Sequence, residues 1–171
     1  MPTGKPTIYW DTSIFLALIK DENRPNGEMD GVYYFAHKIA QNEIILLTST
    51  LINVEILQST LSEEAKGRFN NLFKRRNCIQ ADPSIRIMQL ASRIRDYYQN
   101  QKGDRTLSTP DSIHLATAIQ YGVNELHTFD ENEDTSRGWR ALIPLNGIVA
   151  GEYPLKICKP TIPPLPLFHK V

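Results

Sequence analysis

Apolar residues along the chain fall into short continuous runs that are separated by segments of helical periodicity. Continuous runs of this kind predict strands that are buried on both faces of a parallel sheet, where polar residues do not alternate with apolar ones. Such runs predict strands at 8–10 and 43–48, and a further strand is predicted at 123–129. Apolar positions at helical spacing predict helices at 13–19, 33–42, 51–57, 63–73 and 82–98. Strands that alternate with helices predict an α/β fold, a three-layer sandwich around a mainly parallel sheet.

A sixth helix is predicted from the residues that open it. Thr109 serves as the expected N-cap, Pro110 stands in the first turn, and the acid Asp111 follows. Polar segments at 21–27 and 101–108 are typical of loops. Because no repeat or linker divides the sequence, we expect a single domain over residues 1–171, with its main motifs at about 8–130.

The last part of the chain, at about 144–171, is a proline-rich C-terminal extension with one predicted strand at 155–158. Four prolines argue against a helix or a central strand beyond it, namely Pro160, Pro163, Pro164 and Pro166. Such a tail could pack on a neighbouring subunit or a partner protein, or close the edge of the sheet.

Composition narrows the class of protein. Apolar residues make up 41% of the 171 residues and charged residues 22%, which is typical of a soluble globular chain. No apolar run approaches the ~18 residues of a membrane span, and the N-terminal segment lacks the apolar stretch of a signal peptide. The two cysteines, Cys78 and Cys158, have no metal-type spacing and are too few for a disulfide scaffold. We therefore expect a reduced, cytoplasmic protein with no membrane partner.

The charge balance argues against one kind of nucleic-acid binder. The formal net charge is zero with histidine neutral, so extensive non-specific binding to duplexes is not expected. A local basic rim around an acidic centre is compatible with this balance. Its candidates lie in one short segment and are Lys66, Arg68, Lys74, Arg75 and Arg76. A solvated helix face explains any one of them at least as well.

Four acidic residues stand at the ends of apolar runs, and they are the most informative feature of the chain. They are Asp11, Glu55, Asp111 and Asp130. A carboxylate that follows a strand points out of the C-terminal edge of the sheet, where open α/β folds bind ligands. Several carboxylates that converge there repel one another unless a cation lies between them. Since Mg²⁺ and Mn²⁺ prefer oxygen ligands, the pattern predicts a metal site.

Each acid also has an ordinary structural explanation. Asp11 fits the N-cap of the next helix, and Asp111 stands in a first turn, where the helix dipole stabilises an acid by about 0.3–1 kcal/mol. Glu55 lies among apolar residues, where an unpaired carboxylate is costly unless the helix edge is partly exposed. Asp130 opens the acidic stretch 130–134, which a solvated loop would explain. Asp134 is a further candidate ligand that ranks below Asp130.

Other polar residues near the acids are interpreted as supporting ones. His114 lies one turn after Asp111 and is expected to be a core histidine or to support a ligand, not to act as a catalytic base. The hydroxyls of Thr12, Ser13 and Thr128 could orient a carboxylate, although caps and turns use the same residue types.

Four blocks that contain these acids resemble the motifs of PIN-domain nucleases. They are 9–16 (YWDTSIFL), 54–57 (VEIL), 111–118 (DSIHLATA) and 126–130 (LHTFD). The blocks occur in the family's order. The family includes the toxin ribonucleases of bacterial toxin–antitoxin pairs.

The resemblance implies a metal-dependent endoribonuclease that cuts RNA and leaves a 5′-phosphate and a 3′-hydroxyl. It implies one or two Mg²⁺ or Mn²⁺ ions whose ligands are Asp11, Glu55, Asp111 and Asp130. An antitoxin protein and a second copy of the chain, as a homodimer, are the expected partners. Candidates for binding the flanking phosphates are Arg24, Arg68 and Arg75.

Two other interpretations stay open. A PIN-like domain could bind RNA or a partner protein without cutting, although the retention of all four acids argues against a dead site. A phosphoacceptor domain of the response-regulator kind clusters aspartates at similar strand ends, but it requires a late lysine, for which Lys156 is a loose candidate. The dinucleotide-binding and P-loop glycine motifs are missing from the sequence, as is the second aspartate that haloacid-dehalogenase phosphatases carry two residues after the first.

Overall fold

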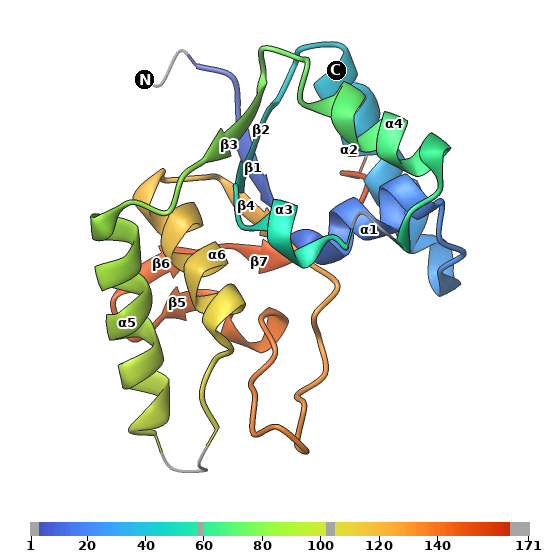
Figure 1. The fold of residues 1–171 in the computed structure, drawn as a ribbon. Helices are drawn as coiled ribbons and strands as arrows, with labels where there is room; N and C mark the ends of the chain where they lie inside the picture. The colour runs from blue at the N-terminus through green and yellow to red at the C-terminus, as the bar shows by residue number, and fades with distance from the viewer. Residues whose placement is uncertain (1–3, 58–59, 102–104, 165–171) are drawn as a thin grey trace, which may run out of the picture.

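The computed structural model describes residues 4–57, 60–101 and 105–164. Its centre is a five-stranded parallel sheet with the strand order β3-β2-β1-β4-β7 (Figure 1). The strands are β1 (Thr7–Trp10), β2 (Ile45–Ser49), β3 (Cys78–Ala81), β4 (Glu125–His127) and β7 (Ile157–Cys158). Parallel neighbours require crossover connections, which the helices supply. The predicted α/β sandwich with a parallel sheet is confirmed.

Helices lie on both faces of this sheet (Figure 1). One layer contains α1 (Thr12–Lys20), α2 (Glu28–Ala40) and α4 (Glu63–Leu72). The opposite layer contains α5 (Ile85–Gln99) and α6 (Thr109–Gln120). The short helix α3 (Ile52–Glu55) follows β2, and two 3₁₀ turns occupy η1 (Pro25–Gly27) and η3 (Ile143–Leu145). A small antiparallel hairpin, β5 (Gly147–Val149) and β6 (Tyr153–Leu155), joins the layer of α5 and α6.

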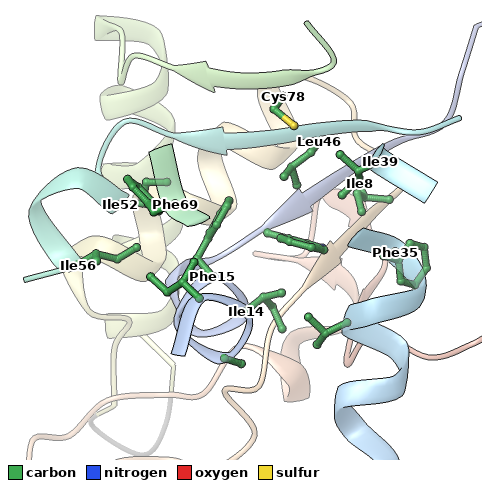
Figure 2. Packing of buried hydrophobic residues seen from close by; sticks show 14 of the residues in the cluster. Ile8, Ile14, Phe15, Phe35, Ile39, Leu46, Ile52, Ile56, Phe69 and Cys78 are labelled. Atoms are coloured by element: carbon green, nitrogen blue, oxygen red, sulfur yellow. The ribbon is translucent and has the colours of Figure 1, made fainter. Parts of the chain in front are cut away.

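The alternation of side chains along β1 divides the core between the two faces. Ile8 and Trp10 pack into the cluster that contains residues of α1, α2 and α4 (Figure 2). Tyr9, which lies between them, packs instead into the cluster formed with α5 and α6. Because successive strand residues point to opposite faces, a strand buried on both sides has no polar position to alternate. This explains why the sequence shows the strand as a continuous apolar run.

One strand of the sheet was missing from the sequence-based expectation. β3 forms an edge of the sheet and pairs with β2 only, from Leu46 with Cys78 to Ser49 with Ala81. Its short sequence, CIQA, leaves Ile79 42% exposed, so it lacks the continuous apolar run that marks β1 and β2. Cys78 itself is buried, as expected of a core residue.

Helix boundaries also differ from the prediction at several points. α2 begins at Glu28, earlier than expected, because the turn η1 leads directly into it. α6 begins after Ser108, whose side chain accepts from the Asp111 amide, so Ser108 is the N-cap in place of the predicted Thr109. Pro110 still stands in the first turn, where its missing N–H leaves no intrahelical bond unmade.

The described part of the C-terminal extension packs against α2 and the segment after β4. The strand expected at 155–158 is divided between β6 and β7. Beyond it, the backbone of Pro160 lies so close to Gly31 of α2 that a Cβ at Gly31 would meet the Pro160 oxygen at 1.9 Å. Lys159 forms ion pairs with Glu28 and Glu131, each at 2.7 Å. Residues 165–171, including Pro166, lie outside the described residues, and a partner for the tail stays a prediction. No described helix combines the length and apolar character that crossing a bilayer requires.

Candidate active site

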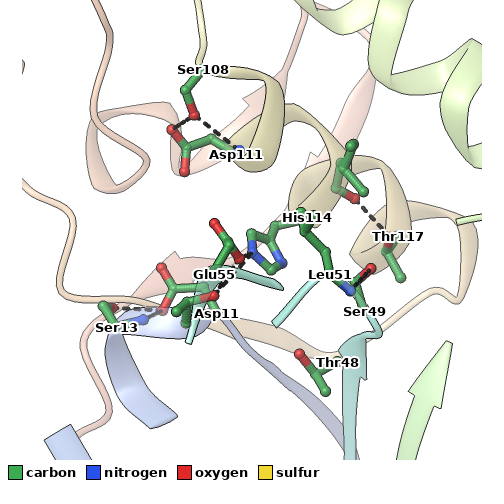
Figure 3. Close-up of polar contacts among 12 residues, drawn as sticks. Asp11, Ser13, Thr48, Ser49, Leu51, Glu55, Ser108, Asp111, His114 and Thr117 are labelled. Atoms are coloured by element: carbon green, nitrogen blue, oxygen red, sulfur yellow. Dashed lines mark hydrogen bonds and ion pairs between the residues drawn. The ribbon is translucent and has the colours of Figure 1, made fainter. Parts of the chain in front are cut away.

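The four predicted acids come from elements that end or begin at the same edge of the sheet. Asp11 directly follows β1, Asp130 follows β4, Glu55 is the last residue of α3, and Asp111 lies in the first turn of α6. A cleft of about 350 Å³ opens at this edge, and its walls include Glu55, Asp111, Asp130, Asp134, Trp139 and Arg140. Asp11 does not line the cleft, but its charge raises the pKa of Asp111 and of Asp130, and Figure 3 shows it in the same region as Glu55. The arrangement therefore gathers residues that lie up to 119 positions apart in the sequence (Asp130 and Asp11).

Asp11 is both the N-cap of α1 and a member of the acid cluster. Its Oδ1 accepts hydrogen bonds from the amides of Ser13 (3.0 Å) and Ile14 (3.3 Å) and from the Ser13 hydroxyl at 2.6 Å. Its Oδ2 accepts from the hydroxyl of Thr128 at 2.5 Å. Burial raises the pKa of this carboxyl, and these hydrogen bonds oppose the rise. The capping role foreseen for Asp11 is thus real, and it fixes the orientation of the carboxylate.

Two hydroxyls connect Asp11 to the segment after β4. Ser13 Oγ, which donates to Asp11, accepts from the amide of Phe129 at 3.0 Å. Thr128 Oγ1, which also donates to Asp11, accepts from the amide of Asp130 at 2.9 Å. Because each hydroxyl donates to one element and accepts from the other, the start of α1 and the chain around Asp130 are locked together.

Glu55 is held by two donors from different elements. Its Oε2 accepts from the hydroxyl of Thr12 at 2.5 Å and from Nε2 of His114 at 2.7 Å (Figure 3). Burial raises the pKa of Glu55, but the hydrogen bonds and the charge of His114 outweigh it, so the pKa is lowered overall. Glu55 is therefore an anion near neutral pH, with a defined side-chain position.

His114 has a clearer role than the sequence suggested. It is 1% exposed, and its Nδ1 lies 2.7 Å from the hydroxyl of Tyr9. That hydroxyl accepts from the amide of Ser49 at 3.0 Å, and burial raises the pKa of Tyr9, so the phenol keeps its proton. The histidine thus bridges the buried Tyr9 and the carboxylate of Glu55. The interpretation as a core or supporting histidine agrees with this placement.

Asp111 and Asp130 face the cleft with less support. Asp111 Oδ2 accepts from the hydroxyl of Ser108, and Asp130 Oδ2 accepts from the amide of Leu142 at 2.9 Å. Burial raises the pKa of Asp111 to about 6; the Ser108 hydrogen bond opposes this rise, and the charge of Asp130 adds to it. The pKa of Asp130 is also raised, by burial and by the charge of Asp11. These mutual effects are those expected of carboxylates that share a site.

Asp134 occupies a different kind of position. It lines the cleft, but its Oδ1 accepts from the amide and hydroxyl of Ser136 and from the amide of Arg137. These bonds, together with an ion pair to Arg137 at 3.6 Å, lower the pKa of Asp134. The carboxylate is therefore largely used in folding its own turn, which is consistent with its rank below Asp130.

None of the basic residues expected at the rim is among those that line the cleft. Arg68 donates to the carbonyl of Ile19 and to Glu64, and Arg75 donates to the carbonyl of Ala40. Arg24 pairs with Glu22 and stands over the ring of Phe129 at 3.9 Å. The arginine that does line the cleft is Arg140, which the sequence analysis did not single out. In the sequence Arg140 has only Arg137 near it, so no cluster of basic residues pointed to it.

A second group of potential ligands, Glu125, His127 and Cys158, lies outside this cleft. His127 Nδ1 accepts from the indole N–H of Trp10 at 3.1 Å, so its proton is on Nε2, which donates to Glu125 at 2.9 Å. If Nε2 bound a metal, the proton of the neutral imidazole would be on Nδ1. Nδ1–H would then face the indole N–H of Trp10, which is also a donor. Glu125 is further paired with Lys156 at 2.6 Å. These contacts satisfy the group without an ion.

Comparison with known proteins identifies the family. The model of the PIN domain family matches residues 8–135. The chain belongs to the PIN domain family. The match covers every acid of the candidate site, including Asp134, and ends before the C-terminal extension. No curated protein sequence matches the chain at a significant level.

Solved structures share the PIN fold at low sequence identity. VapC20 of Mycobacterium tuberculosis, described as a sarcin–ricin loop cleaving toxin, is 16% identical, with a TM-score of 0.51 over 72% of this chain and 89% of that one. VapBC2 of Rickettsia felis, bound to a promoter DNA fragment, is 18% identical, with a TM-score of 0.51 over 71% and 86%. A toxin–antitoxin complex from Klebsiella pneumoniae is 19% identical, with a TM-score of 0.51 over 78% and 95%. Solved structures with this fold thus include a toxin and a toxin–antitoxin complex.

PIN nucleases generally use a divalent metal, and the carboxylates that line the cleft have oxygens to offer one. Among the described residues, the three potential ligand atoms that lie within 4.8 Å of one another belong to Glu125, His127 and Cys158, and none of the four acids is among them. One oxygen each of Glu55, Asp111 and Asp130 accepts the hydrogen bonds given above, while no hydrogen bond reaches the other oxygen within the described part of the chain. In the same part of the chain, no lysine or arginine forms an ion pair with any of these three or with Asp11. Unpaired carboxylate oxygens at one cleft are the donor set that hard cations require.

Proposed function

We propose that this PIN domain is a metal-dependent endoribonuclease that hydrolyses RNA phosphodiester bonds. Asp11, Glu55, Asp111 and Asp130 would hold one or two Mg²⁺ or Mn²⁺ ions. The observation that supports the proposal most is a cleft lined by Glu55, Asp111 and Asp130, none of which has a lysine or arginine partner among the described residues. Asp11 is buried and does not line this cleft, but its charge raises the pKa of Asp130. Membership of the PIN family supports nuclease chemistry for this cleft.

The surrounding residues act by holding the carboxylates in place. Ser13 and Thr128 fix both oxygens of Asp11, while Thr12 and His114 fix one oxygen of Glu55. Asp111 is oriented by Ser108, the N-cap of its own helix. A bound divalent cation supplies a lower pKa for a bound water and offsets the charge that develops on the phosphate. Fixed ligands reduce the reorganisation needed to bind that cation.

Cleavage of RNA by purified protein tests the proposal. Wild-type protein should cut single-stranded RNA with Mg²⁺ or Mn²⁺ and leave 5′-phosphate and 3′-hydroxyl ends, and EDTA should abolish cutting. Asp111→Asn and Asp130→Asn should each lower cleavage by orders of magnitude, whereas Asp134→Asn should do less damage. Protein that binds RNA yet leaves it intact across both metals, with no inhibitor present, would show that the domain is a scaffold.

We further propose that the protein is the toxin of a toxin–antitoxin pair and forms a homodimer in the cytoplasm, where its RNA substrate is found. Support comes from the solved relatives that are described as a toxin or as toxin–antitoxin complexes. Co-expression with a small protein encoded immediately upstream should yield a complex in which RNA cleavage is inhibited. Sedimentation analysis of the isolated chain tests the homodimer.

The position of Lys156 does not support the phosphoacceptor interpretation. Lys156 precedes β7, so it lies at the N-terminal edge of the parallel sheet, whereas Asp11 and Asp130 follow their strands at the opposite edge. Its ammonium group is paired with Glu125.

A further inference from the structure

A large aromatic side chain stands open in the wall of the acid cleft. Trp139 is 36% exposed and lines the cleft together with Glu55, Asp111 and Asp130. The other tryptophan, Trp10, is 0% exposed and packs in the core. Leaving an indole half open to water gives up part of the stabilisation that its burial would provide. Its position beside the acids points to a ligand with an apolar face.

The loop that carries Trp139 holds the indole in a defined place. The carboxylate and the carbonyl of Asp130 accept from the amides of Leu142 and Ile143, each at 2.9 Å, which closes the base of the loop. Within the loop, the Trp139 amide donates to the carbonyl of Asp134 at 2.9 Å, and the Asp134 side chain caps the same turn. The backbone of Trp139 is thus fixed to Asp134, within a loop whose base closes on Asp130.

Two arginines lie near this ring. The guanidinium of Arg137 stands over the Trp139 ring at 5.2 Å from its centre, while Arg140 shares the lining of the acid cleft with Trp139. Arg140 lines the acid cleft and also a second hollow of about 400 Å³, whose walls include Tyr97, Tyr98 and Asn146. Its Nε donates to the carbonyl of Arg105 at 2.8 Å, and its guanidinium lies 5.4 Å from the ring centre of Tyr98. In the described part of the chain no carboxylate pairs with Arg140, whereas Arg105 and Arg137 pair with Glu133 and Asp134. The charge of Arg140 is therefore available to an anion.

Aromatic rings that receive bases, beside arginines that receive phosphates, are the elements from which sites for single-stranded nucleic acid are built. We propose that Trp139 is a stacking platform for one nucleobase of single-stranded RNA next to the acid cleft, and that Arg140 binds the phosphate leading toward the second hollow. The inference rests on the proposed function for the identity of the ligand. Stacking requires no particular base, so this platform binds any sequence, with preference only for bases that stack well.

Tryptophan fluorescence tests the platform directly, because the only other tryptophan is buried. The probe is a short single-stranded oligoribonucleotide with Mg²⁺, added to Asp130→Asn protein so that cutting is suppressed. The RNA should quench the emission of Trp139. In the same background, Trp139→Phe should abolish the quenching and bind within threefold of its parent, since the ring is retained. Trp139→Leu should weaken binding roughly 5- to 150-fold, the range expected for one stacked base.

Two controls separate stacking from charge. An oligonucleotide of the same length with abasic residues should bind the parent and Trp139→Leu with equal affinity. Arg140→Gln should lower the affinity for both oligonucleotides and reduce the salt dependence of binding by about one counterion. Tyr121→Leu, an exposed aromatic at the far end of α6, and Arg76→Gln, before β3 at the opposite edge of the sheet, should leave binding unchanged.

The outcomes distinguish this inference from the proposed function. If wild-type protein cuts RNA while Trp139→Leu binds and cuts as well as wild type, the platform is refuted and the nuclease stands. If no RNA is cut but the quenching and the loss in Trp139→Leu persist, the platform stands on a scaffold. A Trp139→Leu variant that binds RNA normally but no longer binds an antitoxin would show that the ring receives a protein, and would also refute the platform.

Discussion

Two histidine–glutamate pairs lie on either face of β1 and are built from the same parts. Tyr9 contacts Nδ1 of His114, whose Nε2 meets Glu55; the next residue, Trp10, contacts Nδ1 of His127, whose Nε2 meets Glu125. Adjacent strand residues point to opposite faces, so one strand supports both pairs.

The pairs differ in whether the glutamate has a second, positively charged partner. Glu125 also meets Lys156 at 2.6 Å, and the hydrogen bond from His127, with the lysine, lowers its pKa to about 2. Glu55 has no lysine or arginine partner within the described residues and faces a cleft with Asp111 and Asp130. The charge of Glu125 is thus balanced within the protein, whereas Glu55 keeps negative charge for a ligand. Similar local geometry thus serves stability in one place and binding in the other.

Neutralising the two glutamates should give the largest contrast. Glu55→Gln removes an anionic ligand and should lower RNA cleavage by orders of magnitude while the fold is retained. Glu125→Gln breaks a charged hydrogen-bond network and should lower the free energy of unfolding by about 1–3 kcal/mol, with cleavage by the folded protein unchanged. Paired measurements of cleavage rate and urea unfolding check both. Equal loss of cleavage in the two variants would contradict the division.

The pH dependence of stability should have opposite signs in the two regions. The pKa of Asp111 is raised from 3.8 to about 6, so the metal-free native state binds its proton more tightly than the unfolded chain, and stability should fall as pH rises from about 4 to 6. The change is up to roughly 3 kcal/mol at 1.36 kcal/mol per pKa unit. The pKa of Glu125 is lowered from 4.5 to about 2, so its contribution should be lost as pH falls through that interval.

Thermal unfolding in EDTA across pH 4 to 7 measures the first effect. Asp111→Asn should flatten the fall in stability, because its side chain does not titrate. If the stability of wild type and of Asp111→Asn changed with the same slope between pH 4 and 6, the assignment to Asp111 would be contradicted.

Added metal should stabilise the folded protein through the acid cleft and not through the Glu125 pair. A ligand that binds only the native state adds about 2.7 kcal/mol at a hundredfold excess over its Kd. We expect a higher melting temperature with Mn²⁺ or Mg²⁺ than with EDTA for wild type and for Glu125→Gln, and a smaller shift for Asp11→Asn. The same metal shift in Asp11→Asn as in wild type would mean that Asp11 is not a ligand.

The two histidines should show the smallest difference, because each acts through its glutamate. His114→Asn removes a donor to Glu55 and should lower metal affinity and cleavage about 10- to 100-fold, as loss of a residue that orients a ligand does. His127→Asn should leave metal affinity unchanged and lower stability. Titration with Mn²⁺, followed by the melting temperature, separates positioning from simple destabilisation. Normal Mn²⁺ affinity in His114→Asn would remove the histidine from the site.

The sequence by itself determined the inner strands, the alternating α/β order and the four acids. Strands covered on both faces are mostly apolar, as at 8–10 and 44–47, and an acid at the end of such a run stands out because burial without a partner is costly. The resemblance of the surrounding blocks to PIN nucleases agreed with the family that the comparison showed. Roles for the individual acids are still predictions.

Only the tertiary structure decided the rest, because those features depend on contacts between distant residues. β3 is a strand because β2 offers it an edge, and its own four residues carry no clear pattern. The sequence names no partner for His114 or His127, and only the packing shows that one supports an open glutamate and the other a paired one. Trp139 and Arg140 come to line the acid cleft through a loop closed on Asp130, a placement set by hydrogen bonds that no periodicity or spacing encodes.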